Sequence, residues 1–140
     1  MKDLKILIVE DDFSSRFLLQ KFLEPYGTCY IAINGKEAVE AVKTAIDTNE
    51  PYNLICLDIM MPEMDGHDAL REIRKTEEEN GILSSEGAKI IMTTALGDMK
   101  NINRAYHNLC DGYLTKPVSK SKLLENLRML GFIASPTNTL

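Results

Sequence analysis

The chain has 140 residues, of which 44% are hydrophobic and 26% charged, and its net charge is −5. This length suits one domain with its own core and is too short for two, and the composition excludes a disordered chain. The acidic balance and the lack of a long basic run argue against nucleic acid as a direct partner. No apolar run approaches the roughly 18 residues of a membrane span, and the first residues lead into a predicted strand rather than a signal peptide, so we expect no membrane association and a cytoplasmic protein.

Short apolar runs alternate with longer helical patterns along the chain. The first part is predicted to contain, in order, a buried strand at Lys5–Val9, a helix capped by Ser14 or Ser15 and ending near Glu24, an edge strand at Thr28–Ile33, a helix at Lys36–Thr48 and a strand at Leu54–Leu57. The second part is predicted to contain a helix from Gly66, a surface loop at Asn80–Ala88, a strand at Lys89–Thr93, a helix at Asp98–Leu109, a strand at Gly112–Thr115 and a helix at Ser119–Leu130. We expect one domain over residues 1–130 and a loose tail over 131–140.

Five such β-α units predict an α/β fold of the flavodoxin-like type. Parallel strands need crossover connections, and these connections are right-handed, so the helices cover both faces of a five-stranded parallel sheet. We expect the strand order 2-1-3-4-5, which places the first and third strands side by side. Every turn from a strand into a helix then lies at the same edge of the sheet.

Charged and polar residues follow the strands at this edge, namely Asp11, Asp12, Asp58, Thr94 and Lys116. Each has an ordinary explanation when taken alone: Asp11 or Asp12 as a helix cap, Asp58 in a turn, Lys116 in a loop. Those explanations do not account for all five at one edge. Clustered carboxylates repel each other unless a cation offsets their charge, so the pattern predicts a divalent cation site facing one lysine.

Four segments at these positions resemble the receiver domain of two-component response regulators. They are Ile8-Val9-Glu10-Asp11-Asp12, Leu57-Asp58 through Asp65-Gly66, Thr93-Thr94-Ala95 and Lys116-Pro117. The similarity extends from about Lys2 to Leu130, and the length resembles the single-domain, chemotaxis-regulator type.

The resemblance implies that Asp58 accepts a phosphoryl group and forms an acyl phosphate. It implies that Asp11 and Asp12 hold Mg²⁺, or another divalent cation such as Mn²⁺, with Asp12 as the more direct ligand and Asp11 acting partly through water. Asp58 and the backbone carbonyl of Met60 complete the expected metal site. Mg²⁺ prefers oxygen ligands and keeps several waters, so such a set of ligands suffices.

The resemblance assigns the contacts of the phosphoryl group to Thr94 and Lys116, and the role of an aromatic that reports the active state to Tyr113. The peptide bond before Pro117 is expected to be cis. The expected donor is a histidine kinase or a histidine phosphotransfer protein. The chain is thus expected to be a stand-alone signalling switch that catalyses its own phosphorylation and dephosphorylation, and not an enzyme that turns over an external substrate.

Phosphorylation is expected to change the surface formed by the predicted fourth helix, fifth strand and fifth helix, for an unknown downstream protein. That surface has a mixed but basic character through Lys100, Asn103, Arg104, His107, Lys120 and Lys122. The chain is expected to be a monomer or a phosphorylation-dependent dimer. The resemblance also implies that the side chains of Met60 and Leu96, two residues after Asp58 and Thr94, flank the water that removes the phosphoryl group. Methionine and leucine cannot orient this water by hydrogen bonds, so we expect slow loss of the phosphoryl group.

Three other functions remain open at this point. A phosphatase of the haloacid dehalogenase type needs a second aspartate two residues after its nucleophile, and Met60 occupies that position. A flavodoxin-like cofactor binder needs a phosphate-binding loop rich in Gly, Ser or Thr after the first strand, where this chain has three acids. A docking module that works without phosphorylation is disfavoured by the intact Asp58, Asp12, Thr94 and Lys116.

Overall fold

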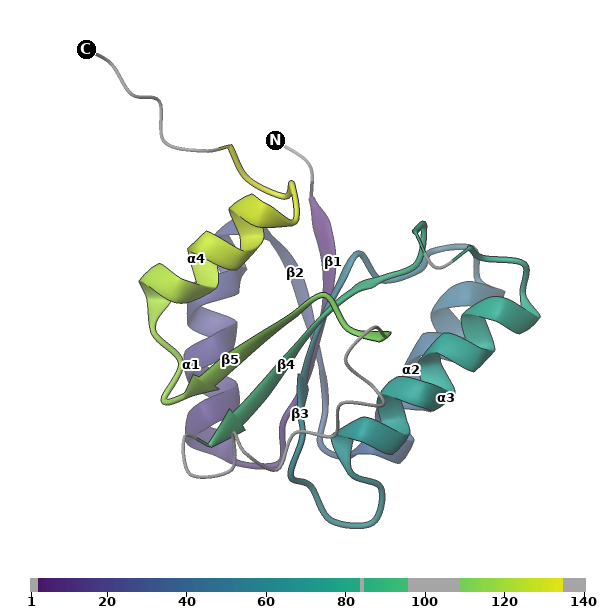
Figure 1. Cartoon of the computed structure of the whole chain (residues 1–140), viewed down its shortest axis with the longest axis horizontal. Coiled ribbons are helices and arrows are strands. Elements are labelled where there is room, and N and C mark those ends of the chain that lie inside the picture. Colours follow the sequence, from purple (N-terminus) through teal and green to yellow (C-terminus); the bar gives the residue numbers. More distant parts are fainter. Residues whose placement is uncertain (1–2, 84, 96–108, 135–140) are drawn as a thin grey trace.

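The computed structural model describes residues 3–83, 85–95 and 109–134. Its elements are β1 (Leu4–Val9), α1 (Phe13–Leu23), a 3₁₀ turn (Glu24–Tyr26), β2 (Gly27–Ala32), α2 (Gly35–Asp47), β3 (Leu54–Asp58), α3 (Gly66–Glu79), β4 (Lys89–Ala95), β5 (Gly112–Lys116) and α4 (Lys120–Met129) (Figure 1). The helix predicted at Asp98–Leu109 lies outside the described residues except for Leu109, as do Leu96, Lys100, Asn103, Arg104 and His107. The label α4 therefore belongs to the helix predicted at Ser119–Leu130.

The strands form one parallel five-stranded sheet in the order β2-β1-β3-β4-β5. This confirms the predicted flavodoxin-like topology, with β2 at an edge as its more polar sequence indicated. β1 and β3 are adjacent in the middle of the sheet, with Val9 opposite Leu57. The residues that follow these two strands are consequently brought together.

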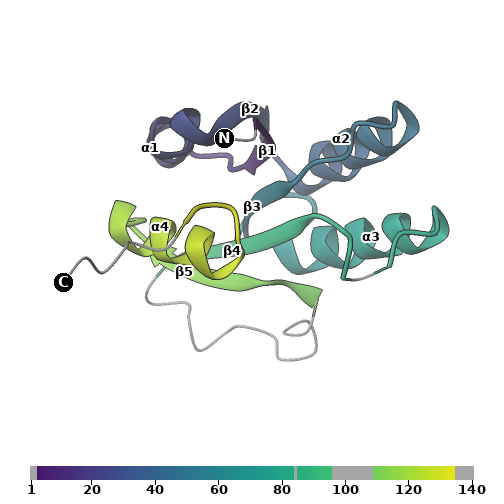
Figure 2. The ribbon, with the colours of Figure 1, turned by 90° about the horizontal axis from the view of Figure 1, so that it is seen from above.

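Helices cover both faces of the sheet, and each face has its own hydrophobic core. α1 and α4 pack on one face and α2 and α3 on the other, as the two views of the ribbon show (Figures 1 and 2). β3 is buried along its whole length, which explains its continuous apolar sequence. None of the helices in the described part of the chain is long and apolar enough to cross a membrane.

Three strands extend further than their apolar sequences indicate. β3 includes Asp58, β4 includes Thr94 and β5 includes Lys116, all three predicted to lie in the turns beyond. The strand pairing continues into these residues because backbone hydrogen bonds form regardless of side-chain polarity. Asp58 is opposite Thr93, and Ala95 is opposite Lys116. These side chains are therefore held by the sheet rather than by loops.

The predicted cap of α1 was wrong. Asp12, and neither Ser14 nor Ser15, is the N-cap residue, and its Oδ2 accepts a hydrogen bond from the backbone N–H of Ser15 at 2.9 Å. Aspartate is as good an N-cap as serine, and its position directly before Phe13 lets the helix start earlier than a cap at Ser14 or Ser15 would allow. This changes the interpretation of the three acids that follow β1.

Candidate functional site

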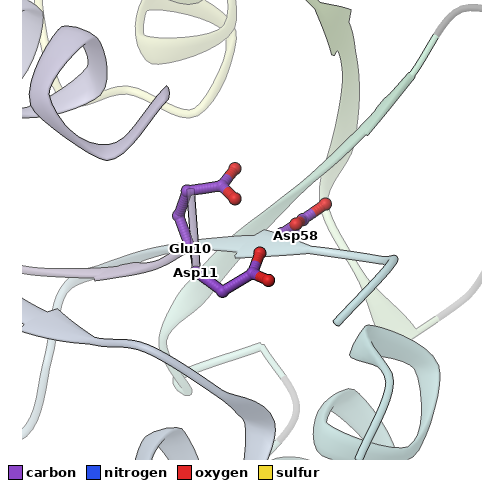
Figure 3. Close-up of side chains that lie close together, drawn as sticks. All are labelled: Glu10, Asp11 and Asp58. Carbon is purple, nitrogen blue, oxygen red and sulfur yellow. The ribbon is translucent and has the colours of Figure 1, made fainter. Parts of the chain in front are cut away.

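Three carboxylates converge where β1 and β3 end. One oxygen from each of Glu10, Asp11 and Asp58 lies within 4.8 Å of the others (Figure 3). Glu10 and Asp58 are buried, with 0% and 2% of their surface exposed, whereas Asp11 is exposed. The site thus has a buried floor and an open side toward solvent.

The structure brings two of the three predicted metal-binding carboxylates together and places the third elsewhere. Asp12 is not in this group, because its side chain caps α1, and this hydrogen bond to Ser15 lowers the pKa of Asp12. Glu10 takes its place, although it was not among the ligands predicted from the sequence. The missed signal was the capping preference of an acid directly before a helix, which favours Asp12 as the cap of α1 and leaves Glu10 to join the carboxylate group.

Glu10 directly follows β1, and its backbone and side chain are both held by hydrogen bonds. Its backbone N–H donates to the carbonyl of Ala32 at 3.1 Å, so it continues the pairing of β1 with β2. Its Oε2 accepts a hydrogen bond from the backbone N–H of Asp12 at 3.1 Å. Glu10 is thus held in the buried part of the site, while Asp12 caps α1.

Lys116 faces the carboxylates from the end of β5. Its Nζ lies 2.6 Å from Oε1 of Glu10 and 3.2 Å from Oδ2 of Asp58. Burial raises the pKa of Glu10 to about 7, and the nearby charge of Asp58 adds to this while Lys116 opposes it. Burial likewise raises the pKa of Asp58 against the influence of Lys116. For Lys116 itself burial acts to lower the pKa, but the hydrogen bond to Glu10 and the charge of Asp58 outweigh it and raise the pKa.

The other predicted residues lie on the neighbouring strands or directly after β3. Thr94 is buried on β4, in the strand that pairs with β3. The backbone N–H of Met60 donates to Oδ1 of Asp58 at 3.3 Å, and Met60 is 61% exposed. Tyr113 lies on β5 opposite Met92. The Lys116–Pro117 peptide bond is cis, as predicted.

The carboxylate group suits a hard divalent cation. Three carboxylates beside one ammonium leave an excess of negative charge in a partly buried space. Carboxylate oxygens are the donors that Mg²⁺ prefers, and the open side at Asp11 leaves room for the waters that Mg²⁺ retains. The residues present therefore fit the implied metal.

A comparison with protein-family models matches residues 6–128 to the response regulator receiver domain. The chain belongs to this family. Receiver domains are signalling switches of two-component systems that accept a phosphoryl group from histidine kinases or phosphotransfer proteins. The predicted resemblance is confirmed.

Among curated relatives, the chemotaxis protein CheY of Halobacterium salinarum is 34% identical over 86% of this chain and 91% of its own length. The hybrid signal transduction histidine kinase B of Dictyostelium discoideum is 36% identical over 86% of this chain. The chain spans only 6% of that kinase and 47% of the probable transcriptional regulator ycf27 of Cyanophora paradoxa. Similar domains therefore occur both in much longer proteins and in one of comparable length.

The similar solved structures include two receiver domains that are 28% identical to this chain. The receiver domain of the histidine kinase CKI1 from Arabidopsis thaliana, complexed with Mg²⁺, has a TM-score of 0.76 and covers 91% of each chain. The receiver domain of Ssk1 from Saccharomyces cerevisiae, crystallised with the histidine phosphotransfer protein Ypd1, has a TM-score of 0.75 and covers 97% of this chain and 94% of that one.

Proposed function

We propose that Asp58 accepts a phosphoryl group from a histidine kinase or a histidine phosphotransfer protein, in a reaction that depends on Mg²⁺. The observation that carries this proposal is the position of Asp58: a buried carboxylate at the end of β3, grouped with Glu10 and Asp11 and 3.2 Å from the ammonium of Lys116. The family of the chain supports the same assignment. Carboxylates are competent acceptors when charge on the phosphoryl oxygens is neutralised.

In the proposed transfer, a carboxylate oxygen of Asp58 forms a bond to phosphorus while the bond from phosphorus to the donor's histidine nitrogen breaks. The donor imidazole leaves with that electron pair, and the product is an acyl phosphate. Lys116 neutralises charge on the transferred group, and the hydroxyl of Thr94 donates to one of its oxygens. The backbone N–H of Met60 holds Oδ1 of Asp58, which orients the carboxylate.

The proposed metal ligands are Glu10, Asp11, Asp58 and the backbone carbonyl of Met60. When bound, the cation supplies charge neutralisation that lets an anionic donor approach an anionic pocket. The chain itself catalyses the gain and the loss of the phosphoryl group and, on this proposal, turns over no external substrate. Met60 is 61% exposed and its backbone is hydrogen-bonded to Asp58, so on this proposal its apolar side chain slows hydrolysis by limiting the access of water to the acyl phosphate.

The phosphodonor has a candidate docking surface on α1, whose N-cap directly follows Asp11 in the chain. Phe13 and Phe17 are 67% and 49% exposed, and their rings are stacked with centroids 5.9 Å apart. Exposed aromatics are favoured anchors of protein interfaces. This surface lies beside the site, where a donor histidine must approach.

The output is proposed to be a change in the surface that includes β5 and α4, read by a downstream protein. In this proposal the chain acts as a stand-alone, cytoplasmic domain over residues 1–130 with a tail over 131–140, and as a monomer or a phosphorylation-dependent dimer. The hydroxyl of Thr94 and the ring of Tyr113 are the elements that link Asp58 to that surface. Lys120 and Lys122 begin α4 and are exposed, which suits an acidic or polar partner.

Incubation with Mg²⁺ and acetyl phosphate tests the proposal directly. Wild type should gain one phosphoryl group, detected as a shift in mass of the intact protein and by its loss in hydroxylamine, which cleaves acyl phosphates. Asp58→Asn should gain none, and chelation of the metal should prevent the reaction in wild type. Equal labelling of Asp58→Asn would contradict the assignment.

Purified histidine-phosphorylated phosphotransfer protein tests the docking surface. Phe17→Ala should slow transfer from this donor by roughly 10-fold, as loss of an interface anchor does, and should leave transfer from acetyl phosphate unchanged. Ile33→Ala, at a 47% exposed apolar residue after β2, is the matched control. Equal slowing with both donors would place the effect in the site rather than in docking.

A further inference from the structure

Arg74 joins three parts of the fold through one side chain. It lies on α3 with 13% of its side chain exposed. Its Nε donates to the carbonyl of Leu109 at 2.8 Å, and its Nη1 donates to the carbonyl of Ala88 at 2.8 Å. Ala88 directly precedes β4, and Leu109 lies shortly before β5. Arg74 therefore ties α3 to the beginnings of two strands.

Two carboxylates complete the contacts of Arg74. Its Nη1 lies 2.7 Å from Oε1 of Glu77, and its Nη2 lies 3.0 Å from Oδ2 of Asp111. Both acids are also held by the backbone, because the N–H of Ala88 donates to Glu77 at 2.8 Å and that of Ile90 donates to Asp111 at 2.8 Å. A guanidinium whose planar donors are shared among fixed acceptors is held in one geometry.

The turn held by Arg74 contacts Tyr113. Cys110 lies between Leu109 and Asp111, and its side chain lies close to that of Tyr113, whose hydroxyl oxygen is buried. Leu109, Cys110 and Tyr113 all pack against the core beneath α2 and α3. The position of the turn thus sets where the ring of Tyr113 can pack.

The other end of α3 begins beside Asp58. The backbone N–H of Gly66, the first residue of α3, donates to the carbonyl of Ile59 at 2.7 Å. From there α3 runs past Arg74 as one uninterrupted helix, which moves as a unit. One rigid element therefore connects the neighbourhood of Asp58 to the turn that contacts Tyr113.

We propose that Arg74 is a positioning residue, which holds the turn Leu109–Asp111 so that a change at Asp58 shifts Tyr113 between two defined arrangements. This inference rests on the proposed function, because it assumes that Asp58 is the phosphorylated residue. Without Arg74 the turn loses its tie to α3, and Tyr113 samples both arrangements whether or not Asp58 is modified. The site itself, which does not contact Arg74, keeps its response.

Nuclear magnetic resonance of the full chain tests this, with Mg²⁺ and beryllofluoride as the probe of Asp58. The backbone resonance of Ile59 reports the site, and those of Cys110 and Gly112 report the turn. Arg74→Gln should retain the full shift of Ile59 on addition of beryllofluoride and lose more than half of the shift of Cys110 and Gly112. A purely structural role would not separate these two responses.

Arg71→Gln is the matched control, because Arg71 lies one turn earlier on α3 with 57% of its side chain exposed. It should respond as wild type does. If Arg74→Gln does not fold, Asp111→Asn serves in its place, because it weakens the ion pair between Arg74 and the turn while keeping Arg74. It should likewise retain the shift of Ile59 and lose more than half of the shift of Cys110 and Gly112. An undiminished shift of Cys110 in Arg74→Gln and Asp111→Asn would overturn the inference. Absence of any beryllofluoride shift in wild type would instead contradict the proposed function.

Discussion

The ammonium of Lys116 lies closer to Glu10, at 2.6 Å, than to Asp58, at 3.2 Å. Lys116 is therefore shared between a proposed metal ligand and the proposed acceptor. Glu10 and Asp58 are both proposed metal ligands, so a bound cation would compete with Lys116 for the oxygen atoms of both carboxylates. In the proposed function, this competition loosens Lys116 from the carboxylates and leaves its ammonium available to the phosphoryl group.

Glu10→Gln should weaken Mg²⁺ binding. Glutamine keeps the size of the side chain and removes one negative charge, so we expect a loss of affinity of at least the roughly 10-fold typical of disturbed metal sites. Isothermal titration calorimetry with Mg²⁺ measures this affinity. Asp12→Asn is the control, because asparagine caps helices as well as aspartate does, and its affinity should stay within about 2-fold of wild type. A large loss in Asp12→Asn with none in Glu10→Gln would restore the ligand assignment made from the sequence.

The free energy of unfolding of the metal-free protein should fall as the pH rises from about 4.5 to 7. Burial raises the pKa of Glu10 from 4.5 to about 7, so in this window the folded state binds more protons than the unfolded state. The raised pKa of Asp58 acts in the same direction. Lys116 contributes a constant stabilisation here, because its raised pKa matters only above its ordinary value of 10.5.

We expect a decrease on the order of 2 kcal/mol between pH 5 and 8, since each unit of pKa difference corresponds to about 1.4 kcal/mol. Urea denaturation with a chelator present measures it. Glu10→Gln should show a smaller dependence on pH, because its amide does not titrate. If the variant and wild type had equal pH dependence, Glu10 would not be its source. Added Mg²⁺ should raise stability more at pH 8 than at pH 5, where protons compete for Glu10.

The fold and most of the site were predictable because both follow from strand ends. Alternating strands and helices with right-handed crossovers leave few topologies, and the sheet edge then gathers Asp58, Thr94 and Lys116. Whether Glu10 or Asp12 joins Asp11 and Asp58 in the carboxylate group was harder to predict. The three consecutive acids look alike in sequence, and their roles differ only because the backbone turns from β1 into α1 at this point. Arg74 and Glu77 are spaced like an ordinary surface pair on a helix, and nothing in that spacing indicates the carbonyl groups that Arg74 binds.

Met60→Asn should accelerate loss of the phosphoryl group from Asp58. Methionine cannot orient a water molecule by hydrogen bonds, and Met60 is 61% exposed beside Asp58. An amide at this position can position the attacking water, so we expect about 10-fold faster decay, which corresponds to about 1.4 kcal/mol of barrier. The decay of labelled acyl phosphate after removal of the donor measures it. Met129→Asn, at a 79% exposed residue of α4, is the control, and an unchanged rate in Met60→Asn would dispose of the idea.

Gly66→Ala should destabilise the fold and impair phosphorylation together. A Cβ at Gly66 would overlap the carbonyl oxygen of Asp58 and lie 2.7 Å from Cα of Ile59, and backbone atoms cannot move aside as a flexible side chain can. Alanine is the better helix former, so a loss of stability would come from this overlap rather than from helix propensity.

We expect a loss of about 1–3 kcal/mol, as for other overpacked positions, together with slower labelling by acetyl phosphate because the carbonyl belongs to the acceptor residue. Gly81 is the control: its φ is +74° and nothing lies within 4 Å of the position that a Cβ would take there, so alanine strains only the local backbone. Gly81→Ala should therefore cost stability without changing the labelling rate. Equal labelling rates in the two variants would show that the close approach of α3 to Asp58 is not needed for the chemistry.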